Sequence, residues 1–82
     1  MKYLVSKTKA VNLANVSEIY ISNNYLMLTT SGGSYCRDIS FVYGTPEELS
    51  ALFDAILTFI SDDFVSGAGS KVFNCDEFIK TL

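Results

Sequence analysis

The chain lacks histidine and tryptophan, and its 82 residues include only one proline and two cysteines. Without histidine, the commonest general base of enzymes is missing. Two cysteines alone cannot complete a structural zinc site, which needs four ligands. Charged residues make up 18%, below the roughly 25% usual for soluble domains. We therefore expect neither a catalytic centre nor a metal site, and no cofactor.

Long hydrophobic runs are also missing, because no apolar stretch approaches the roughly 20 residues that a membrane span needs. The apolar start at Tyr3 is followed at once by Lys7 and Lys9, so it is too short for the core of a signal peptide. We expect a cytoplasmic protein with no membrane contact, in which Cys36 and Cys75 are reduced thiols. A disulfide in an exported protein is the alternative.

Apolar residues, by contrast, make up 49% of the chain. This content excludes a disordered chain, and the length fits a single domain over residues 1–82. A domain of this size buries only about 60–65% of its unfolded surface, so its own core is small. Part of the apolar surface is therefore expected to meet another chain.

Alternation of apolar and polar residues predicts a first hairpin. In residues 17–22, Ile19 and Ile21 point to one face of the strand. Asn23-Asn24 is a favourable turn, since asparagine tolerates positive φ. Residues 25–30 are rich in strand-forming side chains and supply the second strand.

A third strand is predicted for residues 35–43, after a turn at residues 31–34. By alternation, one of its faces has Tyr35, Arg37, Ile39, Phe41 and Tyr43. Residues 3–5 and 71–73 are further strand candidates. Residues 6–10 predict a turn, and residues 11–16 fit either a strand edge or a loop.

A helix start is the strongest local signal. Thr45 is the expected N-cap, Pro46 takes the first helical position and Glu48 completes a capping box. One apolar stripe follows at helical spacing and should end by about residue 64: Leu49, Leu52, Phe53, Ile56, Leu57, Ile60 and Phe64. Asn74 and Glu77 predict a second, short helix. The whole pattern predicts an α+β domain: an antiparallel meander of three to five strands, with one long amphipathic helix on one face and a possible short C-terminal helix.

Charge and tyrosine are unevenly distributed. Residues 38–70 contain six carboxylates and no base, whereas residues 1–37 contain four bases and one acid. The acidic segment is either a solvated helix face or a surface for a basic partner. Tyrosine is enriched in protein interfaces, although the tyrosines here could instead cap a small core. The candidate interface residues are Tyr20, Tyr25, Tyr35, Arg37, Tyr43, Glu47, Glu48 and Asp54.

Two resemblances accompany this pattern. The segment from Val11 to Ile21, followed by Asn24 to Thr30 and Gly33, resembles the opening strands of LytTR-type DNA-binding domains over residues 11–36. The basic segment that contacts DNA in that family has no counterpart, so the resemblance transfers no functional residue. The whole chain also resembles small bacterial and phage proteins with a meander before a Thr-Pro-Glu-Glu helix. That group implies no activity of its own. Phage inhibitors of host defence are often small, acidic and non-enzymatic, so an inhibitor role fits this chain.

The sequence therefore predicts a small acidic protein that binds protein, as an inhibitor or regulator of a host protein with a basic surface, and forms a homodimer through its sheet. One alternative is a protein that sequesters a small molecule or nucleotide, with Arg37 and Lys71 as anion contacts. A second alternative is a nucleic-acid-binding module, although the net charge of −3 disfavours binding to phosphates. The third is an enzyme that uses Cys36 or Cys75.

Overall fold

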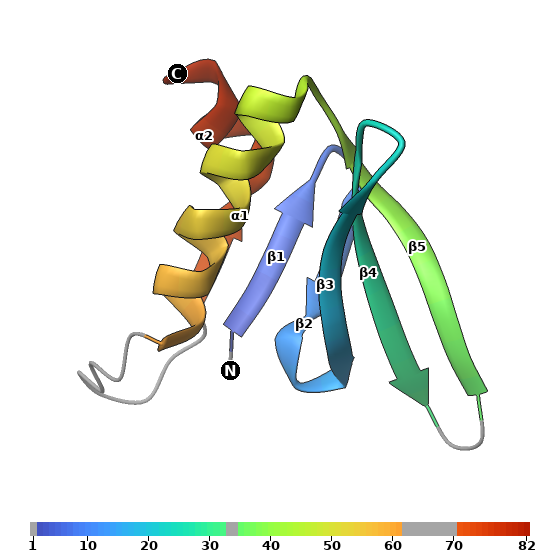
Figure 1. Ribbon diagram of the computed structural model, residues 1–82. Coiled ribbons are helices and arrows are strands. Elements are labelled where there is room, and N and C mark those ends of the chain that lie inside the picture. Colours follow the sequence, from blue (N-terminus) through green and yellow to red (C-terminus); the bar gives the residue numbers. More distant parts are fainter. Residues whose placement is uncertain (1, 33–34, 62–70) are drawn as a thin grey trace.

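The computed structural model describes residues 2–32, 35–61 and 71–82. Its elements follow one another along the chain as shown in Figure 1. They are β1 (Lys2–Ser6), β2 (Lys9–Asn12), the 3-10 helix η1 (Leu13–Asn15), β3 (Val16–Ser22), β4 (Tyr25–Gly32), β5 (Tyr35–Tyr43), α1 (Pro46–Ser61), β6 (Lys71–Asn74) and α2 (Cys75–Lys80). The α+β class, the meander, the long helix and the short C-terminal helix are confirmed.

The strands of the described residues form two sheets of three. One is the predicted meander, with strand order β3-β4-β5, and both of its pairings are antiparallel. The other has the order β2-β1-β6, in which β6 runs parallel to β1. The strand beyond the predicted three to five is β2, which lies where a turn over residues 6–10 and a strand edge or loop over residues 11–16 were predicted. The parallel pairing of β6 with β1 joins residues far apart in the sequence, which no local pattern reveals.

The turn between β3 and β4 matches its prediction. Ser22 and Tyr25 face each other across a two-residue loop in which Asn23 has φ 52° and Asn24 has φ 64°. Both angles are in the left-handed region, where asparagine is better tolerated than most residues. The turn fixes the register of the hairpin, so that Ile19 and Ile21 oppose Leu28 and Leu26.

The predicted alternation of β5 is wrong at its C-terminal end. Leu26 pairs with Val42 while Met27 pairs with Ser40, so Phe41 is the extra residue of a bulge. Phe41 and Val42 are consequently both buried. Tyr43, expected on the face of Ile39, lies on the opposite face.

The turn between β1 and β2 is shorter than predicted. A turn was expected over residues 6–10, but only Lys7 and Thr8 lie between the two strands. Lys7 has φ 54°, an unfavourable backbone angle for lysine. The Asp76 carboxylate supports it, since one oxygen accepts from the Ser6 hydroxyl at 3.0 Å and the other from the Lys7 N–H at 2.6 Å. Asp76 thereby ties α2 to the β1–β2 turn.

Helix α1 begins with the predicted capping box. The Thr45 N–H donates to the Glu48 carboxylate at 2.9 Å, and the Glu48 N–H donates to the Thr45 hydroxyl at 3.2 Å. The last residue that the structure describes in α1 is Ser61, so the predicted end near residue 64 lies outside the described residues.

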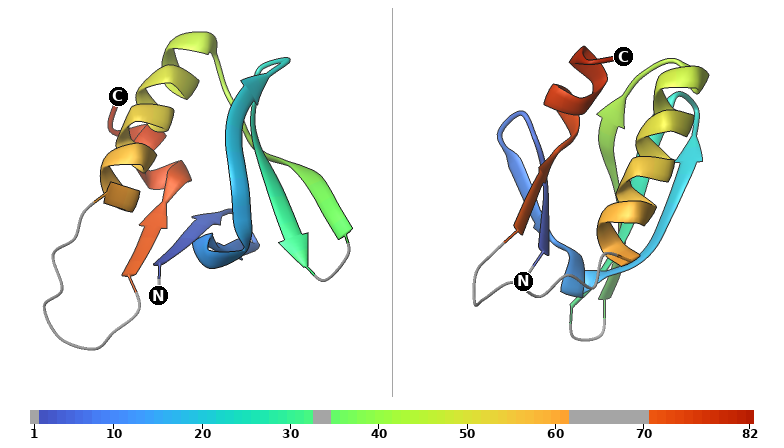
Figure 2. Two further views of the ribbon diagram at one scale, coloured as in Figure 1. Left: turned by 60° about the horizontal axis from the view of Figure 1, so that its bottom comes forward. Right: turned by 90° about the vertical axis from the view of Figure 1, so that its left-hand side faces the viewer.

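The buried core lies between α1 and both sheets. In the right-hand view of Figure 2, α1 lies in front, with β6 on one side and β3 on the other. Each sheet and both helices contribute to a single cluster. Its members are Leu4, Leu26, Leu28, Phe41, Val42, Leu49, Leu52, Ile56 and Cys75.

The C-terminal end of α1 is held by a side chain from β1. The Lys2 ammonium donates to the carbonyls of Phe59 at 2.7 Å and Ile60 at 2.9 Å, and it lies 5.5 Å from the centre of the Phe59 ring. The last turn of α1 has no basic residue of its own. Lys2 therefore supplies the positive charge that the helix dipole favours at this end.

We predict that Lys2→Met lowers the free energy of unfolding by about 1–2 kcal/mol, because two charge-assisted hydrogen bonds at the end of α1 are lost. Urea unfolding measures this change. Lys80→Met is the control. The Lys80 ammonium lies 3.7 Å from the Glu77 carboxylate and both side chains are exposed, so the substitution should change stability by less than about 0.5 kcal/mol. Equal losses for both variants would contradict the capping role of Lys2.

Candidate protein-binding groove

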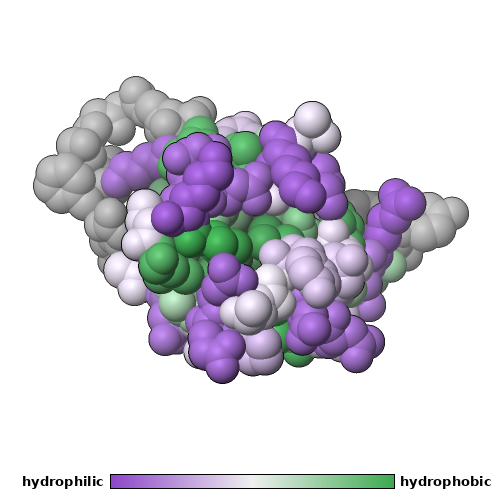
Figure 3. Space-filling view, turned by 90° about the horizontal axis from the view of Figure 1, so that it is seen from above, coloured by the Kyte–Doolittle hydropathy of each residue, from purple (hydrophilic) through white to green (hydrophobic). Residues whose placement is uncertain are grey.

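Apolar surface gathers in a hollow between hydrophilic groups when the molecule is viewed from above (Figure 3). Three large apolar side chains of α1 and β3 are substantially exposed: Leu57 by 45%, Ile60 by 40% and Ile21 by 42%. Leu57 and Ile60 belong to the predicted apolar stripe of the helix. The stripe is thus wider than the core that it covers, and its outer part stays in contact with solvent.

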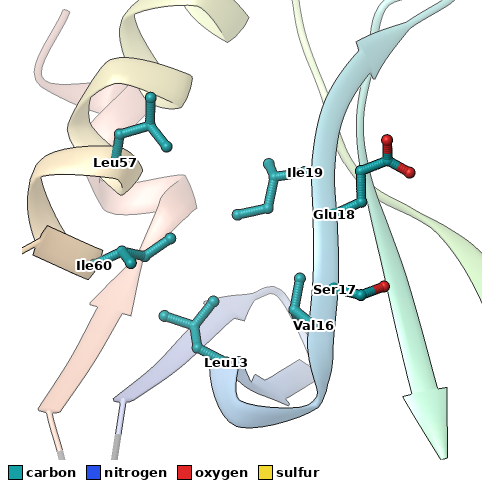
Figure 4. Close-up of a pocket in the computed structure, with 7 residues that line it drawn as sticks. All are labelled: Leu13, Val16, Ser17, Glu18, Ile19, Leu57 and Ile60. Carbon is teal, nitrogen blue, oxygen red and sulfur yellow. The ribbon is translucent and has the colours of Figure 1, made fainter.

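Leu57 and Ile60 form one wall of a groove of about 240 Å³. The side chains of Leu13, Val16 and Ile19 lie opposite them and point into the same space, as Figure 4 shows. We call this space, between α1 on one side and β3 with η1 on the other, the α1–β3 groove. Five of its seven lining residues are apolar, the other two being Ser17 and Glu18, so water inside it is readily displaced by an apolar side chain.

A bulge at the start of β3 shapes the groove. Val16 pairs with Thr30, and Glu18 pairs with the very next residue, Thr29, so Ser17 is the extra residue. The bulge leaves Ser17 and Glu18 pointing away from the groove while Val16 and Ile19 point into it (Figure 4). The groove thereby has an apolar floor although the sequence of β3 does not alternate strictly here.

The charged side chains of the two elements that form the groove are all acidic, and one of them, Glu18, lies at its rim. Neither β3 nor α1 contains a lysine or arginine, while β3 contains Glu18 and α1 contains Glu47, Glu48 and Asp54. Asp54 lies one helical turn before Leu57, on the exposed side of the helix. At the end of α1, the Lys2 ammonium bonds the carbonyls of Phe59 and Ile60. The arrangement favours a ligand with positive charge beside an apolar part.

The structure divides the predicted interface residues between two faces. Tyr20, Tyr25 and Tyr43 lie together on the outer face of the meander, turned away from α1, and the rings of Tyr25 and Tyr43 meet edge to face at 5.2 Å. Glu47, Glu48 and Asp54 lie on α1, at the opposite face.

The two remaining members of the predicted set belong to β5. Arg37 is exposed near the start of the strand, opposite Thr30 and on the side of Ile39. Tyr35 opposes Gly32 in the backbone ladder, and its side chain lies outside the described part. The apolar residues of the groove were absent from the predicted set, although the width of the helix stripe was the signal that could have indicated them.

Two carboxylates, those of Asp38 and Glu18, act on Tyr20 at the tyrosine face. Desolvation, the charge of Asp38 and a hydrogen bond to its carboxylate raise the pKa of Tyr20, and Glu18 raises it further. The Thr29 hydroxyl also donates to Asp38, at 2.7 Å. A nucleic acid that stacked on Tyr20 would bring its phosphates close to these carboxylates. The surface is therefore poorly suited to the predicted alternative of nucleic-acid binding.

The cysteines give little support to a catalytic role. Both are free thiols, Cys36 exposed on β5 and Cys75 buried at the start of α2. Burial, with a smaller contribution from Asp76, raises the pKa of Cys75 to about 12, so this thiol stays protonated at neutral pH. Within residues 2–32, 35–61 and 71–82, no three side chains of the metal-binding types lie close enough to hold an ion.

A second cavity, also of about 240 Å³, lies between the β1–β2 turn and the end of β5. Lys7, Lys9, Tyr25 and Tyr43 line it together with Asp76. The Lys9 ammonium donates to the Ser40 carbonyl at 3.0 Å. The cations beside this cavity are therefore Lys7 and Lys9, whereas the predicted anion contacts, Arg37 and Lys71, do not line it.

Among the helices of the described residues, none is long and apolar enough to cross a membrane. No protein-family model matches the chain, and no curated protein or solved structure is detectably similar to it. The geometry and charge of the molecule itself are therefore what indicate its function.

We predict that Asp38→Asn lowers the pKa of Tyr20 toward 10.0, because the substitution removes the negative charge beside the hydroxyl. NMR titration of ring-labelled tyrosine resolves this group from the other four tyrosines. Asp54→Asn, on the opposite face, is the matched control and should leave the titration of Tyr20 unchanged. An unchanged pKa in Asp38→Asn would show that the carboxylate does not act on Tyr20.

Proposed function

We propose that this protein acts by binding another protein rather than by catalysis, and that the α1–β3 groove receives the partner. The observation that supports this most strongly is the exposure of Leu57 and Ile60 in an open apolar groove between two elements, α1 and β3, whose charged side chains are all carboxylates. The partner would then have an apolar segment beside basic residues. An inhibitor or regulator of a host protein with a basic surface fits this description.

The energies involved are adequate for such a function. Complete burial of a leucine or isoleucine side chain contributes about 1.5–3 kcal/mol. A few such residues at the centre of an interface commonly supply most of its binding energy. The surrounding carboxylates would chiefly speed association and select basic partners, so binding should weaken as salt is added.

Two further proposals concern the cell and the oligomer. We place the protein in the cytoplasm, where the free thiols of Cys36 and Cys75 would persist. Self-association through the face of Tyr20, Tyr25 and Tyr43 stays a prediction. Light scattering tests it, and a strict monomer at high concentration would exclude it.

We predict that Leu57→Glu reduces capture of the partner from a cell lysate at least about tenfold, since one buried leucine is worth more than about 1.4 kcal/mol at an interface. Quantitative mass spectrometry compares proteins retained by the wild type and by the variant. Thr58→Glu adds the same charge to the neighbouring exposed residue and should retain the partner.

Circular dichroism must show that both variants remain folded, which the exposure of Leu57 favours. A protein that is lost with Leu57→Glu, kept with Thr58→Glu and released by moderate salt is the expected result. If every retained protein binds the wild type and Leu57→Glu equally, the groove is not the binding surface.

The second cavity supports a second candidate function, the sequestering of a small anion with an aromatic ring. Lys7 and Lys9 would face its charge, and Tyr25 and Tyr43 its ring. Such a ligand at about 100 times its Kd should raise the free energy of unfolding by ~2.7 kcal/mol. A thermal-shift screen with nucleotides measures this effect. The same shift in Lys9→Met would contradict binding in this cavity.

A further inference from the structure

We propose that the ligand of the α1–β3 groove is an extended peptide segment of another protein, with alternating apolar side chains and flanking lysines or arginines, and that it adds to the free edge of β3 as a further strand. This inference rests on the proposed function and specifies its partner. Strand addition is a common mode of peptide recognition, in which backbone hydrogen bonds give affinity and pockets select alternate side chains.

The register of the meander determines which backbone groups of β3 are free. Ser22 and Tyr25 close the two-residue turn, so they form a hydrogen-bonded pair. In an antiparallel ladder such pairs alternate with pairs that exchange no hydrogen bonds. Ile21 and Ile19, opposite Leu26 and Leu28, are therefore of the second kind. Their N–H and C=O groups point away from β4, toward the open edge.

The same two residues belong to the apolar side of β3. The Ile19 side chain points into the groove, and Ile21, two residues further along, lies on the same face. A guest residue that pairs with either isoleucine in an antiparallel ladder would place its side chain on this face as well. Free backbone groups, an apolar pocket and the exposed Leu57 thus converge on one guest strand.

The edge of β3 lacks the protection found at the other sheet edges. Proteins commonly guard edges with charges, bulges or short strands. Strands β2 and β6 have only four residues each, and both contain a lysine. Strand β5 has Arg37, Asp38 and a bulge, and its Ser40 carbonyl accepts from Lys9. In β3 the bulge and Glu18 protect only the first half, so Ile19–Ser22 remains open and uncharged.

Charge selects a foreign basic peptide over a second copy of this chain. Edge-to-edge pairing of two β3 strands would bring two sets of these acidic elements together, each with Glu18 and Asp54 and without lysine or arginine. A peptide with lysines or arginines beside its apolar residues would instead be attracted to these carboxylates. A helical ligand would fill the groove but leave the free groups of Ile19 and Ile21 without backbone partners.

The test uses a synthetic peptide in which valine and threonine alternate between two lysines at each end. One derivative is N-methylated at its valines and another at its threonines, which blocks the backbone donors of alternate residues. A scrambled peptide with valines at helical spacing is the control for composition. Fluorescence anisotropy gives affinities for wild type, Leu57→Glu and Thr58→Glu, and NMR hydrogen exchange follows the amides of β3.

The inference predicts that the alternating peptide binds wild type and Thr58→Glu, and binds Leu57→Glu at least about tenfold more weakly. Methylation of one set should weaken binding at least about tenfold while the other set has little effect, because only one set donates to β3. The valine set is the sensitive one in an antiparallel complex. The amides of Ile19 and Ile21 should become protected when the peptide is added.

Four results would overturn the inference. They are equal affinities for the parent and both methylated peptides, preferential binding of the scrambled peptide, protection of the Ile19 and Ile21 amides by self-association without peptide, and the absence of binding by any peptide. If the peptide still discriminates Leu57→Glu from Thr58→Glu in the first two cases, the groove remains the binding site and only strand addition is wrong. If no peptide binds, the inference fails. The proposed function is then tested separately, by comparing Leu57→Glu and Thr58→Glu in the capture of proteins from lysate.

Discussion

The packing of α1 on the meander is the interaction on which the rest of the structure depends. Leu49, Leu52 and Ile56 enter the same buried cluster as Leu26 and Leu28 of β4. That cluster also takes in Leu4 of β1 and Cys75 of α2, so it joins the two sheets and both helices. Because the domain is small, burial of this one cluster is the main contribution that offsets the conformational entropy lost on folding.

The same packing leaves the groove behind. A helix that buries Leu49, Leu52 and Ile56 turns Leu57 toward solvent, since these residues occupy only part of its apolar stripe. The strand β3 lies opposite, and among the described residues it pairs with β4 alone. The sequence is rich in apolar residues, and part of the apolar surface that the core does not use is gathered at this groove. Carboxylates and the outward-facing backbone groups of Ile19 and Ile21 lie beside it.

Much of the fold could be predicted from local patterns, because its signals are local. The capping box at Thr45 and Glu48 and the Asn23-Asn24 turn depend on neighbouring residues and formed as predicted. The pairing of the chain ends and the bulge at Phe41 depend on distant contacts, which periodicity does not encode. The candidate site was missed for the same reason. Whether Leu57 is buried or exposed depends on where β3 lies relative to α1, which is also a distant contact.

The central claim is that the outer part of the α1 stripe is open to solvent in the free protein. Methyl NMR with a soluble paramagnetic relaxation agent tests it directly. The account predicts strong relaxation enhancement for the methyl groups of Leu57, Ile60 and Ile21, and little for those of Leu52 and Ile56. Equal protection of all five residues in a monomeric sample would contradict an open groove.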